Sequence, residues 1–139
     1  MAWSFRLRVA WDECDPDGVV HTADYFRWMD RAMHALMLAA GFGHHATVAM
    51  FGAYAPIVEA SVSAKAPLTF DDEVSVETEV VHWGHRSFRI QFRGFHGSTL
   101  VFEGMEARVW AVIEDGQVRT TRIPDEFRLA LTAAAGATP

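Results

Sequence analysis

The chain has 139 residues, a length typical of one domain, and half of them are apolar, which is enough for a substantial core. Its formal net charge of -6 argues against bulk attraction to nucleic acid or to anionic lipid. A single cysteine excludes an internal disulfide framework, and no apolar run approaches the roughly 20 residues of a membrane span. We therefore expect one cytoplasmic domain over residues 1–139 that binds neither nucleic acid nor a membrane.

The first predicted element is a strand over residues 4–11, where apolar side chains occupy every second position. Residues 12–18, with the sequence DECDPDG, follow as a sharp turn, because a proline and a glycine restrict its backbone path. We call this segment the acidic turn. Beyond it, apolar residues recur every three or four positions from Ala23 to about Ala40, which predicts a long amphipathic helix with Thr22 as its N-cap.

The rest of the chain is expected to form mostly strands after a mobile Gly- and His-rich stretch at residues 41–45. Alternating patterns predict strands over 56–66, 72–83, 86–96 and 100–113, the last being long enough for one strand or a bent pair. Asp115-Gly116 is a hairpin signal, a short helix is expected from Pro124 to Leu131, and residues 133–139 are expected to fray. One long helix followed by consecutive antiparallel strands is an α+β arrangement.

Asp15 in the acidic turn is the leading candidate for catalysis. A carboxylate beside a helix N-terminus can attack a polarised carbonyl group or activate a water molecule as a general base. The open N–H groups at the start of the helix, around Thr22, are suited to stabilise the oxyanion that develops. In the alternative interpretation, Asp15 only accepts backbone hydrogen bonds within the turn. The residues alone leave both interpretations open.

Other polar residues offer weaker candidates. Cys14 should face away from Asp15 and act as a small buried filler, since adjacent side chains in an extended segment point oppositely. Glu59, expected on a central strand, is a reserve carboxylate. The close histidine pairs lack the spacing of a zinc site, so we predict no metal.

Two runs together resemble the hotdog-fold acyl-CoA thioesterases, and within them the 4-hydroxybenzoyl-CoA thioesterase branch: Asp15-Pro16-Asp17-Gly18-Val19-Val20 and Asp24-Tyr25-Phe26-Arg27-Trp28-Met29-Asp30. Weaker echoes of the same branch are Ala55-Pro56-Ile57-Val58, Phe70-Asp71-Asp72-Glu73-Val74 and Trp83-Gly84-His85-Arg86-Ser87-Phe88. The likeness covers roughly residues 5–128. Asp24 stands where the branch usually has Asn, and Thr22 where relatives often carry Tyr or His, so specificity for 4-hydroxybenzoyl does not follow from it.

The resemblance implies a hotdog fold, in which a five- or six-stranded antiparallel sheet wraps one long central helix. It also implies a homodimer or a homotetramer built as a dimer of dimers, with active sites at subunit interfaces. Asp15 would be the catalytic carboxylate, and the amides of Thr22 and Ala23 would face the thioester oxygen. The substrate would be an acyl-CoA, and no cofactor would be needed beyond the coenzyme A of the substrate itself.

Further residues are candidates for substrate binding. His21, beside the helix start, could touch the acyl group or simply pack against an aromatic neighbour, and Tyr25 is one of several rings near the predicted site. Asp30 aligns with a family position close to the substrate. His85 and Arg86 form the best local basic cluster and could bind the phosphates of coenzyme A, or could belong to a solvated strand face.

The sequence therefore predicts an acyl-CoA thioesterase that releases a free acid and coenzyme A from a compact aromatic thioester, such as a benzoyl-CoA-like or 4-hydroxybenzoyl-CoA-like one. The alternatives are a broad thioesterase for short or medium chains, and a non-catalytic module that binds acyl-CoA or acyl-carrier protein. A hotdog dehydratase is less favoured, because no histidine of the helix region is placed persuasively for it. The acyl group, the arrangement of a tetramer and the role of Asp15 as nucleophile or base stay open.

Overall fold

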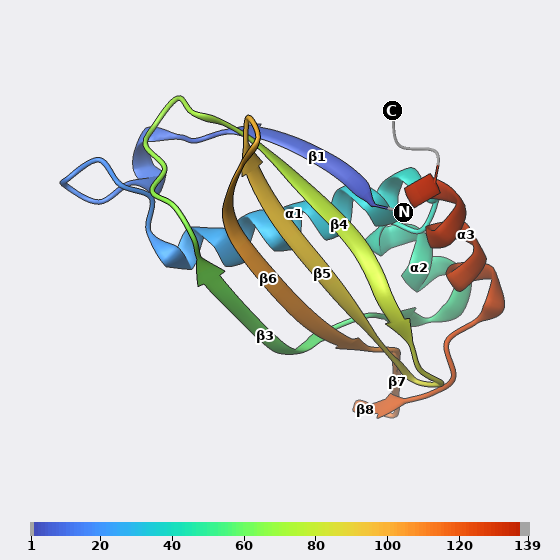
Figure 1. Cartoon of the computed structure of the whole chain (residues 1–139). Coiled ribbons are helices and arrows are strands. Elements are labelled where there is room, and N and C mark those ends of the chain that lie inside the picture. The colour runs from blue at the N-terminus through green and yellow to red at the C-terminus, as the bar shows by residue number, and fades with distance from the viewer. Residues whose placement is uncertain (1, 137–139) are drawn as a thin grey trace.

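The computed structural model describes residues 2–136 and shows a curved antiparallel sheet wrapped around one long helix (Figure 1). The main sheet has the strand order β1-β4-β5-β6-β3, and a small sheet has the order β2-β7-β8. The strands are β1 (Trp3–Arg8), β2 (Ala53–Tyr54), β3 (Ile57–Ala64), β4 (Glu73–Trp83), β5 (Ser87–His96), β6 (Thr99–Val109), β7 (Ala111–Glu114) and β8 (Gln117–Thr120). The helices are α1 (Thr22–Ala39), α2 (His44–Phe51) and α3 (Asp125–Gly136), with a short 3-10 turn η1 (Trp11–Glu13). The predicted α+β arrangement is confirmed.

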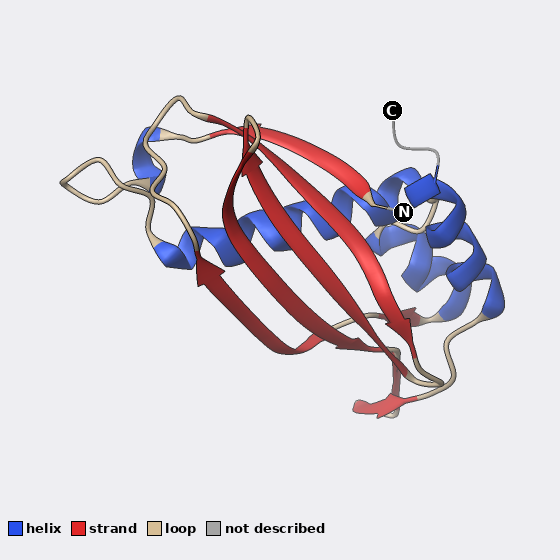
Figure 2. Ribbon diagram, viewed as in Figure 1, coloured by secondary structure: helices blue, strands red, loops and turns tan. Residues whose placement is uncertain are grey.

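Helix α1 lies along the concave face of the main sheet, as Figure 2 shows. The residues that α1 turns toward the sheet are fully buried and recur at steps of three or four: Trp28, Met29, Ala32, Met33 and Leu36. The strands contribute the opposite half of the core with every second residue, including Phe88, Ile90 and Phe92 of β5. The helical period of α1 and the alternation of the strands, which predicted these elements, therefore also place the apolar side chains that form the core.

Two glycines on the inner face of the sheet allow this close packing. A Cβ atom at Gly94 in β5 would overlap the ring of Phe102, which stacks on Tyr25 of α1 with 4.7 Å between ring centroids. A Cβ atom at Gly104 in β6 would lie 2.5 Å from the sulfur of Met29. The absence of side chains at these two positions lets α1 settle onto β5 and β6.

The structure differs from the predicted elements at several boundaries. His21, and not Thr22, is the N-cap of α1, and no side chain caps the helix there. Residues 41–45, predicted to be mobile, include the N-cap and the first two residues of α2, a short helix whose apolar residues follow no helical period. The long strand region breaks at Trp110 into β6 and β7, which is the bent pair. Helix α3 continues to Gly136, so residues 133–136 are helical where fraying was predicted, and residues 137–139 lie outside the described residues.

The structure also differs from the prediction in the position of β3 within the main sheet. β3 forms one edge of the main sheet and β1 the other, so Glu59 lies on an edge strand and the prediction of a central strand was wrong. Most of β3 is exposed, including Ile57 and Val58. Among residues 2–136, no helix has the length and apolar character needed to cross a membrane.

Candidate active site

The acidic turn is closed by its own backbone and by the Asp15 side chain. The Asp15 N–H donates to Val19 O (2.8 Å), and the Gly18 N–H donates to Asp15 O (2.9 Å). Asp15 Oδ1 accepts hydrogen bonds from the N–H groups of Asp17 (2.9 Å) and Val19 (3.1 Å). Gly18 has a φ of +81°, which only glycine adopts at little cost. Asp15 is thus a turn residue through Oδ1, while Oδ2 has no hydrogen bond to residues 2–136.

A short ladder joins the acidic turn to the start of α1. Cys14 and Val20 form an antiparallel bridge, and the His21 N–H donates to Glu13 O (3.0 Å). The Glu13 side chain adds a second link, because its Oε2 accepts from the indole N–H of the buried Trp28 in α1 (2.6 Å). Asp15 follows directly on this ladder, so its position relative to the helix start is fixed.

The start of α1 presents two amides that have no internal partner. Thr22 and Ala23 are the first helical residues, and both are exposed. Their N–H groups make no hydrogen bond among those found within residues 2–136, whereas the next one, that of Asp24, donates to His21 O (3.0 Å). These two donors lie at the positive end of an 18-residue helix. The pair is suited to donate hydrogen bonds to a developing oxyanion.

The next two residues of α1 point inward. The Asp24 side chain is 8% exposed and lies 3.4 Å from Arg27, and burial raises its pKa even though Arg27 opposes the shift. Tyr25 is 2% exposed and packs between Phe102 and Trp28. Tyr25 therefore belongs to the core in this structure, and the predicted contact of its ring with substrate gains no support from its position.

A cavity of about 290 Å³ opens beside Asp15 and is lined by Trp11, Cys14, Asp15, Pro16 and Gly18. The Trp11 side chain is 75% exposed at its rim, and its ring contacts Phe70 edge-on at 4.9 Å. Burial raises the pKa of the Cys14 thiol, and the neighbouring carboxylates of Asp15 and Glu13 raise it further. A thiol held in its neutral form is a poor nucleophile, so the Asp15 carboxylate is better suited than Cys14 to act as a nucleophile or base in this cavity.

A second cavity, of about 430 Å³, lies between the second half of α1, α2 and the start of β3, and we call it the α1–β3 cavity. Asp30, His34 and Arg108 are its charged or titratable lining residues on α1 and β6, together with apolar side chains such as Met37. The Arg108 side chain is only 4% exposed. It donates to Asp30 Oδ1 (3.0 Å), Glu106 Oε1 (2.9 Å) and Ala55 O (3.0 Å).

Sequence reasoning selected Asp30 but missed Glu106 and Arg108. Burial raises the pKa of Glu106, an effect that the adjacent Arg108 guanidinium partly offsets. A signal for both residues was present, because they continue the inward-facing series of Phe102 and Gly104 at every second position of β6. Charged residues at inward positions of a strand indicate a paired, buried site.

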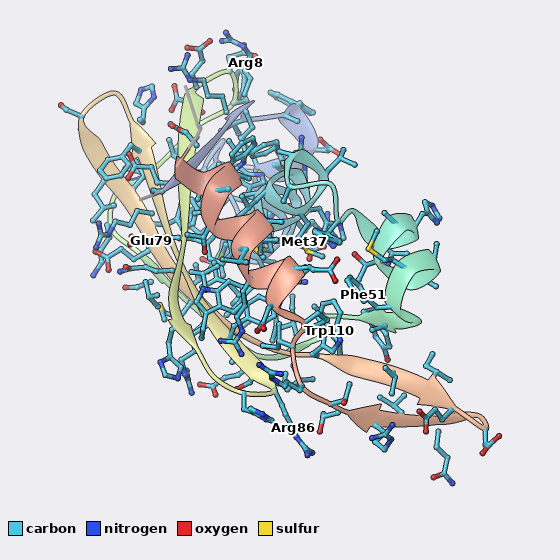
Figure 3. All side chains as sticks on the ribbon, turned by 90° about the vertical axis from the view of Figure 1, so that its right-hand side faces the viewer. Arg8, Met37, Phe51, Glu79, Arg86 and Trp110 are labelled. Atoms are coloured by element: carbon cyan, nitrogen blue, oxygen red, sulfur yellow. The ribbon has the colours of Figure 1, made fainter. Side chains whose placement is uncertain are left out.

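His85 and Arg86 lie in the connection between β4 and β5, residues Gly84–Arg86, which we call the basic turn. Both side chains are exposed, and Figure 3 shows Arg86 projecting away from the body of the protein. The acidic turn lies near the start of β4, since Val19 bridges to Thr69, and the basic turn follows its end. The 11 residues of β4 separate the two turns by about 36 Å at ~3.3 Å per residue.

The structure therefore gathers the predicted residues into three places. Asp15, His21, Thr22 and Ala23 lie together at one end of α1, Asp30 lines the α1–β3 cavity, and the basic turn lies at the far end of the sheet. Within residues 2–136, no three His, Cys, Asp or Glu side chains gather as a metal site would require. One chain alone does not bring the acidic and basic turns together.

Residues 9–131 match the model of a family described as the thioesterase-like superfamily. The chain is 28% identical over 132 residues to the 4-hydroxybenzoyl-CoA thioesterase of Pseudomonas sp. (strain CBS-3), which covers 89% of this chain and 93% of that protein. The crystal structure of that Pseudomonas enzyme superposes with a TM-score of 0.84 at 26% identity, over 93% of this chain and 98% of the other. A gentisyl-coenzyme A thioesterase structure superposes with a TM-score of 0.80 at 30% identity, over 92% and 98%.

Proposed function

Because the chain belongs to the thioesterase-like superfamily and is a thioester hydrolase of the hotdog fold, we propose that it hydrolyses a compact aromatic acyl-CoA. The observation that carries the proposed mechanism is the arrangement at the start of α1. There the ladder through Glu13 and Cys14 links the segment of Asp15, whose Oδ2 has no hydrogen bond within the described residues, to the first turn of α1, where the amides of Thr22 and Ala23 are open. A carboxylate and an oxyanion site are the two elements that thioester hydrolysis needs.

The reaction divides between these groups. The amides of Thr22 and Ala23 donate hydrogen bonds to the thioester oxygen as negative charge develops on it. Asp15 either removes a proton from the water that attacks the carbonyl carbon, or attacks that carbon itself to form an anhydride that water then cleaves. In both routes the C–S bond breaks, coenzyme A leaves as the thiolate and takes up a proton, and the acyl group leaves as the free acid.

We propose that two copies of the chain pair through their β3 edges. This assembly would allow distant parts of the chain to serve one site. β3 runs from the basic-turn end, where Ile57 pairs with Arg108, to the acidic-turn end, where Ala64 pairs with Phe102. Antiparallel pairing of two exposed β3 edges around a two-fold axis would reverse one copy relative to the other. The acidic turn of one copy would then lie at the same end as the α1–β3 cavity and the basic turn of the second copy.

An aromatic acyl group is the proposed substrate class for two reasons. The α1–β3 cavity has a volume of about 430 Å³, within the range of roughly 300–1,000 Å³ typical of small-molecule sites, and its lining is mostly apolar but includes the bonded pair Asp30 and Arg108. Two of the relatives are named for aromatic acyl-CoA substrates, 4-hydroxybenzoyl-CoA and gentisyl-CoA. In this proposal His85 and Arg86 bind the phosphates of coenzyme A, and Asp30 contacts the acyl group.

Release of coenzyme A, followed with a thiol reagent, tests the proposed activity. Benzoyl-, hydroxybenzoyl-, phenylacetyl-, acetyl- and hexanoyl-CoA would be compared, with wild type, Asp15→Asn and Asp17→Asn. We expect the aromatic thioesters to be the best substrates and Asp15→Asn to lower kcat by about 100-fold or more. Asn can still accept the two backbone hydrogen bonds of the turn, so the loss would report on chemistry and not on folding.

Asp17→Asn is the matched control, because Asp17 is an exposed carboxylate in the same turn whose side chain makes no hydrogen bond within the described chain. Its kcat should stay within about twofold of wild type. Equal turnover by Asp15→Asn and wild type would refute the role of Asp15. A preference for acetyl- or hexanoyl-CoA would refute the aromatic substrate class but leave the thioesterase activity in place.

A further inference from the structure

The basic turn is held from within by the C-terminal part of the chain. Three consecutive carbonyl oxygens of the turn each accept a hydrogen bond from a different segment: Gly84 O from Nη2 of Arg128 in α3 (2.5 Å), His85 O from the N–H of Ile123 (3.0 Å), and Arg86 O from the N–H of Trp110 (2.9 Å). The Gly84 N–H closes the turn by donating to Ser87 O (2.7 Å). Figure 3 shows Trp110 near the start of α3 and Arg86 farther out.

This arrangement leaves the basic side chains of the turn, and not its carbonyl groups, available to a ligand. The carbonyl groups, which would repel an anion, are bonded to donors of the protein, and the side chains of His85 and Arg86 remain exposed. Neighbouring arginines differ in this respect, since Arg119 pairs with Glu114 and Arg122 pairs with Asp125. Neither His85 nor Arg86 forms an ion pair with a carboxylate of residues 2–136. The turn thus offers uncompensated donors for an anion in a chain whose net charge is -6.

Arg128 is the only side chain among the three donors that hold these carbonyl groups. Its guanidinium lies 5.5 Å from the centroid of the Trp83 ring, and Trp83 in turn stacks on Phe88 at 5.0 Å. The buried Nε of Arg128 has no hydrogen-bond partner within the described residues. A buried donor without a hydrogen bond costs free energy of desolvation, so an arginine would be unfavourable here if it only filled space. Its directed contact is the hydrogen bond to the basic turn.

We propose that Arg128 is a positioning residue for the nucleotide end of the substrate. It fixes Gly84–Arg86 so that His85 and Arg86 are presented together to the phosphates of coenzyme A. This inference rests on the proposed function, in which the basic turn binds those phosphates. It adds a residue of α3 that contacts no substrate and acts only through the carbonyl group of Gly84.

Direct binding is the first test, because it does not depend on turnover. Coenzyme A and adenosine 3′,5′-bisphosphate would be titrated by calorimetry into wild type, Arg128→Met, Arg128→Lys and Arg93→Met. We expect Arg128→Met to bind both ligands about tenfold more weakly, and Arg128→Lys, which keeps the charge but not the planar fork, several-fold more weakly. Arg93→Met is the matched control, since it removes the same charge from an exposed position in β5, and its affinity should stay within twofold.

Kinetics and hydrogen exchange separate positioning from general stability. For the best CoA thioester, Arg128→Met should raise KM about tenfold with kcat unchanged. For the same acyl group on N-acetylcysteamine, which lacks the nucleotide, neither constant should change. The Gly84 amide, which is bonded inside the turn, should exchange faster with solvent in Arg128→Met than in wild type.

Several outcomes would overturn the inference. Unchanged affinity for both nucleotide ligands in a folded Arg128→Met protein would do so, and so would an equal loss with the N-acetylcysteamine thioester. If Arg128→Met does not fold, the same criteria apply to Arg128→Lys. Arg86→Ala distinguishes this failure from that of the underlying proposal: weaker binding in Arg86→Ala alone refutes only the role of Arg128, whereas no effect in either variant removes the basic turn from the coenzyme A site.

Discussion

The two carboxylate oxygens of Asp15 have different surroundings, which would allow this residue both to hold the turn and to react as in the proposed mechanism. Oδ1 accepts two backbone N–H groups and holds the acidic turn, while Oδ2 has no hydrogen bond within the described chain. The two interpretations that the sequence left open are therefore compatible. A carboxylate locked through one oxygen loses little rotational freedom when the other reacts, which is the benefit of a preorganised site.

Asp24 should make the stability of the protein depend on pH. Burial raises its pKa in the folded state above the unfolded value, so the folded protein resists ionisation of this group. The contribution of Asp24 to the free energy of unfolding is therefore fully present at pH values below its unfolded pKa. It is lost as the pH rises through the raised pKa of the folded state. Asp24→Asn removes that loss. We expect the difference in Tm, variant minus wild type, to be more positive at pH 7 than at pH 3.5.

Thermal unfolding at both pH values checks this expectation. Asp17→Asn serves as the control, because its exposed carboxylate should give similar differences at both. A difference for Asp24→Asn that becomes more negative as pH rises would contradict it, and would mean that the attraction of Arg27 and the helix N-terminus outweighs desolvation.

Parts of the site that depend on residues close in sequence could be predicted, and parts that depend on distant residues could not. The sequence could place Asp15 and Thr22 close together because they are a few residues apart on either side of a turn with recognisable chemistry. Arg108 was missed because its partners, Asp30 and Ala55, lie 78 and 53 residues away in the sequence. Tyr25 was chosen for its ring, and only the fold reveals that this ring is packed on Phe102 in the core.

At the level of elements, the packing of α1 on β5 and β6 depends on the absence of a side chain at Gly94. A methyl group there would overlap the buried ring of Phe102, and the ring cannot move because Tyr25 stacks on it. We expect Gly94→Ala to lower the free energy of unfolding by about 1–3 kcal/mol, as overpacking of a core does. Chemical denaturation of wild type and variant measures this.

The double variant Gly94→Ala with Phe102→Leu is the informative control. Leucine vacates the space that the new methyl group needs, so the double variant should be more stable than the sum of the two single changes predicts. Simple additivity would mean that the glycine is needed for some reason other than the aromatic ring.

The elements themselves were largely predictable, and the exceptions have physical causes. The period of α1 and the alternation of β4 and β5 are long enough to be unambiguous. Helix α2 spans only eight residues, and the apolar character of its sequence has no helical period, so tertiary contacts decide its structure. The break between β6 and β7 at Trp110 arises because this residue turns into the core against Phe127, a contact that local pattern does not encode.

For the whole molecule, the exposed β3 edge predicts that the protein associates. Light scattering should give a mass of about twice 15.5 kDa, or a larger even multiple for a dimer of dimers. Ser61→Lys with Ser63→Lys places like charges along the edge and should yield a species of 15.5 kDa that has lost thioesterase activity.

Ser98→Lys, in the exposed connection between β5 and β6, is the control for added charge and should leave mass and activity unchanged. A wild-type mass of a single chain would contradict the proposed pairing. Full activity in a monomeric variant would contradict a site shared between copies, even if the wild type is a dimer.

The separation of the acidic and basic turns by the length of β4 has an evolutionary consequence under this pairing. In the proposed dimer, each chain would supply the acid of one site and the cavity and phosphate contacts of the other. After gene duplication, one copy could lose Asp15 and the other its basic turn, and a mixed pair would still retain one complete site. Selection would then preserve two sequences, each inactive with itself, as the halves of a single enzyme.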